Sequence, residues 1–246
     1  MYFNQEFADI FEKPHINSSV SSQILFGEKF KVLKREKSFY KVKLYYDGYI
    51  GYLKKNIFLK NYKTTHKINS LKSRIYKLTN NKKIFKTNKF LPFSSEIKIL
   101  DKKRNLIMFK KNFWIRKKDI IKKQHKEKNF SRILNIFKNI PYKWGGRSYT
   151  GIDCSGLIQI YYKYNNIYFP RDTKDQIKYK KGSKYKKNYL KGDIIFWKGH
   201  VGVCLDRKKF IHAYGPKKKV VIMPINKTID RIRKTANLEV LKSFSI

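Results

Sequence analysis

Hydrophobic and polar residues alternate in short runs along the first half of the chain. Residues 24–58 hold several such runs between glycine-containing turns, for example Tyr40, Val42 and Leu44. Alternation with a period of two over four to six residues, interrupted by turn signals, predicts short strands that form a small β-barrel. Residues 68–121 show the same pattern more weakly, which predicts a second barrel of the same kind.

Two pairs of segments in this half resemble each other. ILFGEKFKVL (24–33) parallels LPFSSEIKIL (91–100), and YIGYLKKNI (49–57) parallels FWIRKKDI (113–120). Their spacing indicates an internal repeat of about 65 residues. The alternative is a single irregular β domain.

The periodicity changes after the polar stretch 122–129. FSRILNIFKNI (130–140) places its apolar residues on one helical face and ends before Pro141, which predicts a helix over 130–140. A second helix is predicted to begin near Asp153 or Cys154, because the following apolar residues also share a helical face. Three strands are predicted beyond it, at 193–198, 200–205 and 209–214.

Cys154 is the first candidate for chemistry, in the segment GIDCSGLIQ (151–159). A cysteine in the first turn of a helix lies where unpaired backbone N–H groups and the helix dipole favour the nucleophilic thiolate. A lone cysteine is more often a small buried apolar residue. Gly151 and Gly156 beside it suit a backbone that a substrate approaches closely, which favours a catalytic role.

A nucleophilic cysteine needs a base, and His200 and His212 are the candidates. Three further histidines lie in the β half or in the polar connector, with no motif around them. If the loop near residues 206–208 holds an odd number of residues, His200 and His212 lie on one face of neighbouring strands. One imidazole then takes the thiol proton while the other orients it, as in a catalytic triad.

The net charge of +42 normally indicates a polyanionic partner. Only ten of the 59 basic residues are arginine, whereas readers of bases and phosphates rely on arginine. The lysines are also spread over the whole chain. We therefore expect a compositional background and no specific nucleic-acid partner, with a polyanion-binding surface as the alternative.

Several classes of protein are not expected. No window approaches the roughly 18 consecutive apolar residues of a membrane span, and the acidic N-terminal segment does not resemble a secretory signal. Two cysteines cannot form a disulfide framework, and no metal-ligand spacing or Gly-rich phosphate loop occurs. The sequence alone therefore predicts a cytoplasmic protein without a metal or other cofactor.

From about residue 130 to 225 the chain resembles the NlpC-type bacterial cell-wall peptidases, which are papain-like cysteine hydrolases. The matching segments occur in the family's order: PYKWGG (141–146), GIDCSGLIQ (151–159), FPRDTKDQ (169–176), LKGDIIFW (190–197), HVGVCL (200–205) and FIHAYGP (210–216). The two predicted barrels resemble, more loosely, the bacterial SH3-like domains that precede this catalytic domain.

The resemblance implies an α+β protein with two SH3-like β-barrels followed by a papain-like domain, whose nucleophile lies at a helix N-terminus packed on an antiparallel sheet. The predicted boundaries are 10–62, 63–121 and 126–246. It also implies a thiol hydrolase that cleaves murein stem peptides at the γ-D-glutamyl–diamino acid bond. The implied catalytic residues are Cys154, His200 and His212.

The same resemblance implies substrate-binding residues. Members of this kind often require a free N-terminal amine, and Asp153 fits its carboxylate partner, although it can also cap the helix. The other candidates for the substrate pocket are Ser155, Tyr142, Tyr49, Arg171 and Asp172. Core packing is the alternative for both tyrosines, and a surface salt bridge is the alternative for Arg171 and Asp172.

Two other functions remain open at this level. One is an exported, periplasmic or extracellular endopeptidase that acts on intact peptidoglycan. The other is a basic wall-binding protein with a dormant catalytic fold, which the intact set of cysteine and histidines argues against. The oligomeric state has no sequence signal.

Overall fold

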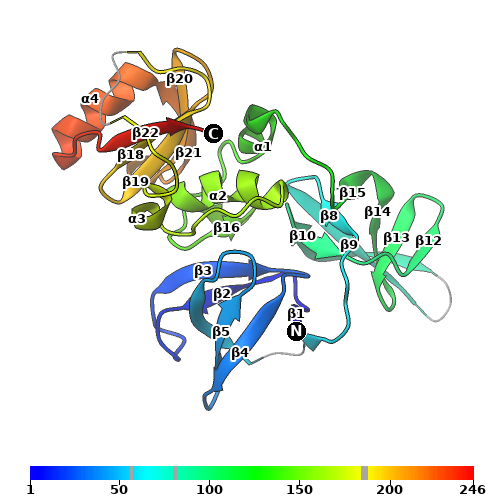
Figure 1. Cartoon of the computed structure of the whole chain (residues 1–246). Coiled ribbons are helices and arrows are strands. Elements are labelled where there is room, and N and C mark those ends of the chain that lie inside the picture. The colour runs from blue at the N-terminus through cyan, green and yellow to red at the C-terminus, as the bar shows by residue number, and fades with distance from the viewer. Residues whose placement is uncertain (56–57, 80–82, 184–187) are drawn as a thin grey trace. The chain divides into compact units, whose positions relative to one another are not determined.

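The computed structural model describes residues 1–55, 58–79, 83–183 and 188–246. These residues form two compact units (Figure 1). The first comprises Met1–Lys126 with Tyr164–Asn166, and the second comprises Glu127–Lys163 with Ile167–Ile246. Both predicted β domains lie in the first unit, and the division of the chain into three domains stays a prediction.

The first unit begins with a five-stranded antiparallel sheet in the order β3-β2-β6-β5-β4. Its strands are β2 (Phe7–Phe11), β3 (Val20–Leu25), β4 (Phe30–Arg35), β5 (Phe39–Leu44) and β6 (Ile50–Lys54), and the short strands β1 (Tyr2–Phe3) and β7 (Phe58–Leu59) pair beside it. Inward-facing apolar residues from alternate positions form its core, which includes Phe3, Ile10, Ile24, Val42 and Leu53.

A second five-stranded sheet has the order β10-β9-β14-β13-β12, and three short strands form the sheet β11-β8-β15. The bounds are β8 (His66–Ile68), β9 (Lys72–Leu78), β10 (Ile84–Pro92), β11 (Glu96–Ile97), β12 (Asp101–Lys103), β13 (Leu106–Lys110), β14 (Phe113–Arg116) and β15 (Ile120–Lys122). A 3-10 turn, η1 (Lys117–Asp119), precedes β15. Phe26, from the turn after β3, is buried in the core of this second sheet.

The internal repeat is confirmed by the topology. Successive strands of the two large sheets occupy the same places, with β9 corresponding to β2 and β14 to β6. The repeated segments also turn alike, since Gly27 and Ser94, at matching positions, both have positive φ, at 76° and 65°. The sheets are SH3-like in their strand order, while their closure into barrels stays a prediction.

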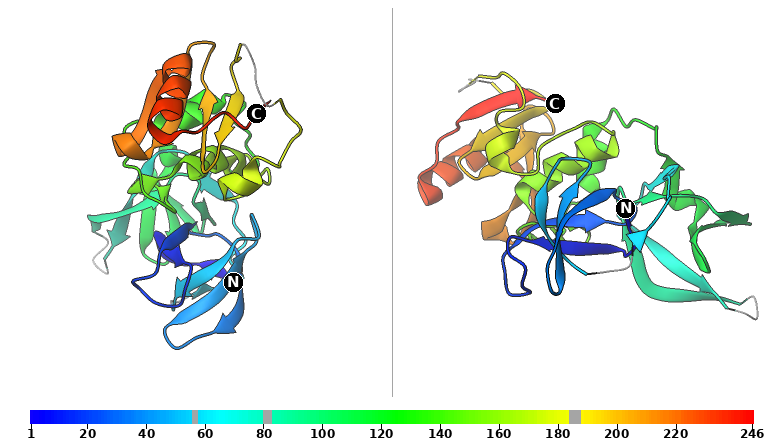
Figure 2. Two further views of the ribbon diagram at one scale, coloured as in Figure 1. Left: turned by 90° about the vertical axis from the view of Figure 1, so that its left-hand side faces the viewer. Right: turned by 60° about the horizontal axis from the view of Figure 1, so that its bottom comes forward.

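The second unit is built on a five-stranded antiparallel sheet in the order β21-β20-β19-β18-β22. Its strands are β18 (Asp193–Trp197), β19 (His200–Cys204), β20 (Lys209–Tyr214), β21 (Lys219–Pro224) and β22 (Lys242–Ser245), and the hairpin β16 (Arg147–Ser148) and β17 (Gly151–Ile152) precedes them. The three strands predicted for this region are confirmed to within one residue. Figure 2 shows this sheet from two further sides, with the chain ending on β22.

Four helices complete the second unit within the described residues: α1 (Phe130–Ile136), α2 (Cys154–Tyr164), α3 (Thr173–Gln176) and α4 (Ile225–Ala236), with the 3-10 turn η2 (Gly215–Lys217) after β20. The predicted start of α2 is confirmed. Helix α1 is shorter than the predicted 130–140, because Phe137 caps it and Asn139 adopts a left-handed φ of 67°.

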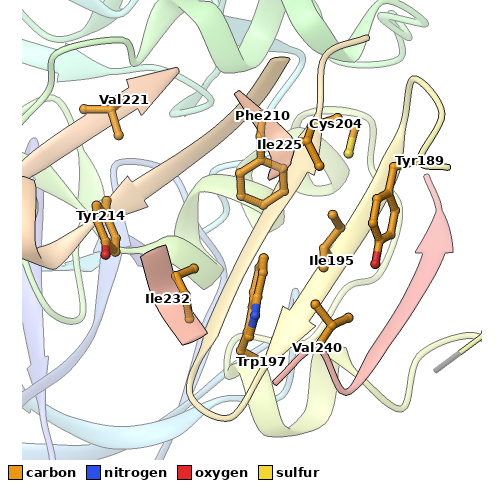
Figure 3. Close-up of a cluster of buried hydrophobic side chains, with 10 residues drawn as sticks. All are labelled: Tyr189, Ile195, Trp197, Cys204, Phe210, Tyr214, Val221, Ile225, Ile232 and Val240. Carbon is orange, nitrogen blue, oxygen red and sulfur yellow. The ribbon is translucent and has the colours of Figure 1, made fainter. Parts of the chain in front are cut away.

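Helix α4 packs on one face of this sheet and closes an apolar core (Figure 3). Ile225 and Ile232 from the helix meet Trp197, Phe210 and Tyr214 from the strands. This core covers the sheet from that side. In the ranges that the structure describes, no helix is long and apolar enough to cross a membrane.

Candidate active site

Cys154 is the first residue of α2, as the sequence predicts. Its side chain is 3% exposed, and its Sγ atom lies 3.9 Å from the carbonyl oxygen of Gly199. Gly199 immediately precedes His200, so the thiol lies beside the first residue of β19. The start of α2 and the start of β19 thus lie side by side, which brings Cys154 close to His200.

Asp153 fixes the start of the helix. Its Oδ1 accepts a hydrogen bond of 2.6 Å from the backbone N–H of Gly156, which is the N-cap interaction expected of an aspartate. Its Oδ2 accepts a 2.8 Å bond from the N–H of Gly145, which ties the preceding loop to the helix. The capping alternative for Asp153 is therefore confirmed.

Arg171 forms a buried bidentate ion pair with Asp153. The Nη2–Oδ2 distance is 2.6 Å and the Nη1–Oδ1 distance is 3.0 Å. Arg171 also donates to the Ser155 hydroxyl at 2.8 Å, and that hydroxyl donates to Asp153 at 3.2 Å. Arg171 is 3% exposed, so the surface salt bridge offered as an alternative is wrong. The site needs a planar guanidinium because only its fork satisfies both carboxylate oxygens.

His200 and His212 form a hydrogen-bonded pair. Val203 lies opposite Ile211 in the register of β19 and β20, so residues 200 and 212 share a face. His200 Nε2 lies 2.9 Å from His212 Nδ1. The register therefore meets the condition stated from the sequence, and both rings lie on one face. Since Nε2 of His200 is engaged, its Nδ1 is the nitrogen left to accept the thiol proton.

With His200 Nδ1 as the base, the proton of the neutral His200 ring lies on Nε2, and this specifies how His212 carries its own proton. Donation from His200 Nε2 requires an acceptor at His212 Nδ1, which leaves the His212 proton on Nε2. That Nε2 is buried and has no hydrogen-bond partner within the described parts of the chain. An unsatisfied buried donor costs about 1–3 kcal/mol. Burial of this unsatisfied N–H group of His212 therefore lowers the stability of the fold.

Burial keeps both partners of the reaction neutral in the resting protein. It raises the pKa of the Cys154 thiol to about 11, which the negative charge of Asp153 reinforces. It also lowers the pKa of His200 to about 4, and lowers that of His212 well below its ordinary value. The lowered thiol pKa expected from the helix N-terminus is therefore wrong. Backbone N–H groups at Val201 and Ser155 do favour the thiolate, but desolvation outweighs them.

Tyr142 and Asp172 lie in the same unit as the thiol, and both lie close enough to Asp153 to feel its charge. Burial raises the pKa of the Tyr142 phenol, and the charges of Cys154 and Asp153 add to the shift, which places its hydroxyl near both. Asp172 precedes α3 and its side chain is half-buried. Burial raises the pKa of its carboxyl, while the adjacent Arg171 acts in the opposite direction. The structure thus brings eight of the nine predicted site residues into one unit.

Tyr49 is the exception, since it belongs to the first unit. Its hydroxyl lies 3.5 Å from the carbonyl oxygen of Ser21, and its ring packs against the core of the first sheet. The packing alternative is thus confirmed for its ring. Its contact with a substrate stays a prediction.

The glycines around Cys154 serve the packing of the chain itself. A Cβ at Gly156 would lie 2.6 Å from the carbonyl oxygen of Gly146, and one at Gly151 would clash with Lys143. We expected these glycines to let a substrate approach the backbone. The structure shows instead that they allow α2 and the preceding loop to pack closely together. Gly202 acts similarly, because a Cβ there would lie 2.8 Å from that of His212.

Sequence reasoning missed two residues of the motif FPRDTKDQ. Gln176 is fully buried, and its amide donates to the carbonyl oxygens of Ser155 and Pro170 at 3.0 and 2.8 Å. Thr173 supplies a hydroxyl that hydrogen-bonds the Cys154 side chain and favours its thiolate. Both residues lie in a segment that resembles the family, and this was the sequence signal that could have identified them. Among the described residues, no three or more His, Cys, Asp or Glu side chains form a group that could hold a metal.

Comparison with known families places two domains on the chain. The NlpC/P60 family matches residues 139–236, and the bacterial dipeptidyl-peptidase SH3 domain matches residues 10–56. Among solved structures, an NlpC/P60 family protein from Bacillus cereus superposes with a TM-score of 0.80 and 19% identity, covering 98% of this chain and 97% of that one. At this identity the likeness shows a shared fold.

Curated relatives match the catalytic region. A γ-D-glutamyl-L-lysine dipeptidyl-peptidase of Bacillus subtilis is 35% identical over 102 residues, which are 38% of this chain and 34% of the relative. A probable endopeptidase of Haemophilus influenzae is 38% identical over 81 residues, 30% of this chain and 50% of the relative. The chain spans about a third of the length of the first of these relatives and half of the second. The chain therefore contains a catalytic domain of the NlpC/P60 family of cysteine peptidases, preceded by a bacterial dipeptidyl-peptidase SH3 domain.

Proposed function

We propose that this protein hydrolyses an amide bond in peptidoglycan stem peptides, between γ-D-glutamate and a diamino acid. The observation that carries the proposal is the position of Cys154 at the start of α2, beside the hydrogen-bonded pair His200 and His212. The choice of this bond is supported by the names of the Bacillus relatives, which are γ-D-glutamyl-L-lysine dipeptidyl-peptidases.

The geometry supports a covalent mechanism. Nδ1 of His200 takes the proton of the Cys154 thiol as the sulfur attacks the amide carbon, which forms a C–S bond and a tetrahedral intermediate. On its collapse the C–N bond breaks, and the same proton passes to the leaving amine. Water, deprotonated by His200, then hydrolyses the thioester. His212 holds the His200 ring in the required orientation throughout.

Asp172 is the carboxylate best able to bind a free substrate amine in this scheme. Asp153 already accepts five hydrogen bonds, two from Arg171 and one each from Gly145, Gly156 and Ser155. A carboxylate has about four lone-pair positions, so Asp153 is saturated. Asp172 is half-buried and close enough to Arg171 to feel its charge. We therefore propose Asp172, in place of Asp153, as the partner of the substrate ammonium, with Tyr142 as a further contact.

A second candidate is an endopeptidase that acts on the intact wall. It is supported by the probable endopeptidase of Haemophilus influenzae and by the Murein DD-endopeptidase MepS/Murein LD-carboxypeptidase of Escherichia coli, which is 32% identical over 92 residues. Recycling of free peptides would place the enzyme in the cytoplasm, whereas cleavage of the wall would place it outside. Cell fractionation with an antibody to the chain distinguishes these locations.

The decisive experiment compares two substrates. The protein is incubated with free L-Ala-γ-D-Glu-diaminopimelate and with intact sacculi, and the products are identified by mass spectrometry. Release of L-Ala-γ-D-Glu from the free peptide alone supports the recycling peptidase. Release of muropeptides from sacculi supports the endopeptidase. No cleavage of either, with Cys154 shown to be reduced, would contradict both and favour a dormant binding protein.

A further inference from the structure

Five aromatic rings lie together on one face of three neighbouring strands. Phe210, His212 and Tyr214 alternate along β20, so all three point to the same side of the sheet. His200 of β19 lies opposite Trp197 of β18 in the register. The apolar members of this group, Trp197, Phe210 and Tyr214, belong to the core closed by α4 (Figure 3).

These rings pack against both histidines, of which His212 is fully buried and His200 is partly exposed. The Tyr214 ring stacks on His212 at 4.6 Å between centroids with an interplanar angle of 14°, and Phe210 meets the same imidazole edge-on at 5.1 Å. The centroid of the His200 ring lies 5.7 Å from that of Trp197 and 5.8 Å from that of Tyr214, and the ring planes are tilted in both pairs. Both distances fall within the roughly 6 Å over which an aromatic face attracts a cation.

Among the described residues, this group of rings includes no carboxylate, which is the group that normally stabilises a catalytic imidazolium. Within the described ranges neither histidine has a carboxylate hydrogen-bond partner, because each is bonded only to the other. The titratable groups around His200 are the Cys154 thiol from α2 and the His212 imidazole and Tyr214 phenol from β20. Apart from the thiolate itself, no anion of the described chain is placed to balance the positive charge formed during catalysis.

We propose that Trp197 and Tyr214 stabilise the His200 imidazolium through their electron-rich ring faces, in place of a carboxylate. When the proton leaves Cys154 Sγ for His200 Nδ1, both flanking rings gain a favourable interaction that is absent with the neutral imidazole. Tyr214 also holds His212, the acceptor for His200 Nε2, by stacking. These two residues therefore act as positioning and charge-stabilising residues for the base, and they lower the barrier to proton transfer. The inference concerns the thiol and its base, and it stands whichever peptide is the substrate.

The test weakens the ring face without changing its shape. Position 214 is replaced by phenylalanine and by phenylalanines of increasing ring fluorination, which progressively remove the negative face. The first readout is the rate at which iodoacetamide alkylates Cys154 at neutral pH, which requires no peptide. We expect this rate to fall in order of fluorination, by about three- to tenfold across the series. The second readout is the pKa of His200, followed by NMR in the Cys154→Ala background, which should fall in the same order.

Two controls separate this role from packing. Phe196 is a fully buried aromatic residue next to Trp197 in β18, so it points to the opposite face of the sheet. Phe196→Leu should lower the melting temperature without changing the pKa of His200, whereas Trp197→Leu should change both. An alkylation rate and a His200 pKa that stay constant across the fluorinated series would overturn the proposal. Because neither readout uses a peptide, that result is distinguishable from a failure of the proposed function.

Discussion

The guanidinium of Arg171 and the carboxylate of Asp153 form two parallel hydrogen bonds, of 3.0 and 2.6 Å, and both side chains are almost fully buried. This pair joins the segment before α3 to the first turn of the helix that carries the nucleophile. It thereby fixes the backbone of Cys154 from a distant part of the sequence.

Removing the arginine should therefore destabilise the fold. Arg171→Ala leaves the Asp153 charge buried and without its cation, which typically costs about 3–5 kcal/mol. Arg233 provides a matched control, because its 3.1 Å pair with Asp230 is exposed on α4. Arg233→Ala should change the free energy of unfolding by about 0.5 kcal/mol or less. Urea denaturation of both variants measures the difference, and equal effects would contradict the structural role of the Arg171 pair.

The two cysteines should behave oppositely. Cys154→Ala should lower kcat/KM on the order of 10⁴-fold, because the covalent step is lost. Cys204 is fully buried in the core against α4 and away from the reacting atoms, so Cys204→Ala should reduce stability while leaving catalysis nearly unchanged. Peptide cleavage followed by mass spectrometry checks both. Activity of Cys154→Ala within tenfold of wild type would exclude it as the nucleophile.

Alkylation of Cys154 should rise with pH well beyond the range of an ordinary thiol. Its pKa is raised to about 11 by burial, so the thiolate fraction increases as the pH rises toward that value. An unperturbed thiol reaches its plateau above about 8.5. The measurement is the rate of inactivation by iodoacetamide against pH, in the free protein. A plateau below about 8.5 would indicate instead a preformed thiolate–imidazolium pair.

The stability of the protein should decrease under mild acid. The pKa of His200 is lowered to about 4 by burial, whereas an unfolded histidine titrates near 6.5. The unfolded chain therefore binds the proton more tightly, so the stabilisation is complete above pH 6.5 and is lost as the pH falls toward 4. His212 shifts in the same direction.

A histidine replacement measures this contribution. The free energy of unfolding of wild type and of His200→Gln is followed from pH 7 to pH 4, and the variant should lose less stability over that range. His125→Gln serves as the control, because the His125 side chain is exposed in the connector. Parallel curves for wild type and His200→Gln would show that His200 titrates alike in the folded and unfolded states.

Local sequence signals predicted the elements that carry the site, because strand alternation and helical periodicity are properties of neighbouring residues. They placed the start of α2 at Cys154 but left the alignment of His200 with His212 conditional on the loop length, which only the register of β19 and β20 decides. The thiol pKa was not predictable in this way, because it depends on burial by segments far apart in the chain. The same is true of Arg171, whose partner Asp153 lies 18 residues away and whose burial required the complete fold.

The last prediction concerns selection of a free amine. If Asp172 binds the substrate ammonium, wild type should cleave free L-Ala-γ-D-Glu-diaminopimelate faster than its N-acetylated form. Asp172→Asn should lose about tenfold to a hundredfold in kcat/KM on the free peptide, since a charge-assisted hydrogen bond contributes roughly 1.5–3 kcal/mol. It should change little on the acetylated peptide.

Two further variants distinguish Asp172 from the other candidates. Asp153→Asn should slow both substrates alike, because it breaks the buried pair with Arg171 and disturbs the helix start. Tyr49→Phe removes only a hydroxyl, and a selective loss on the free peptide would add Tyr49 to the amine site. If Asp153→Asn slowed cleavage of the free peptide alone and Asp172→Asn had no such effect, Asp153 would be the partner of the substrate ammonium. Equal rates of wild type on both peptides would exclude amine selection altogether, because a site built around an ammonium rejects its acylated analogue, and would favour the endopeptidase.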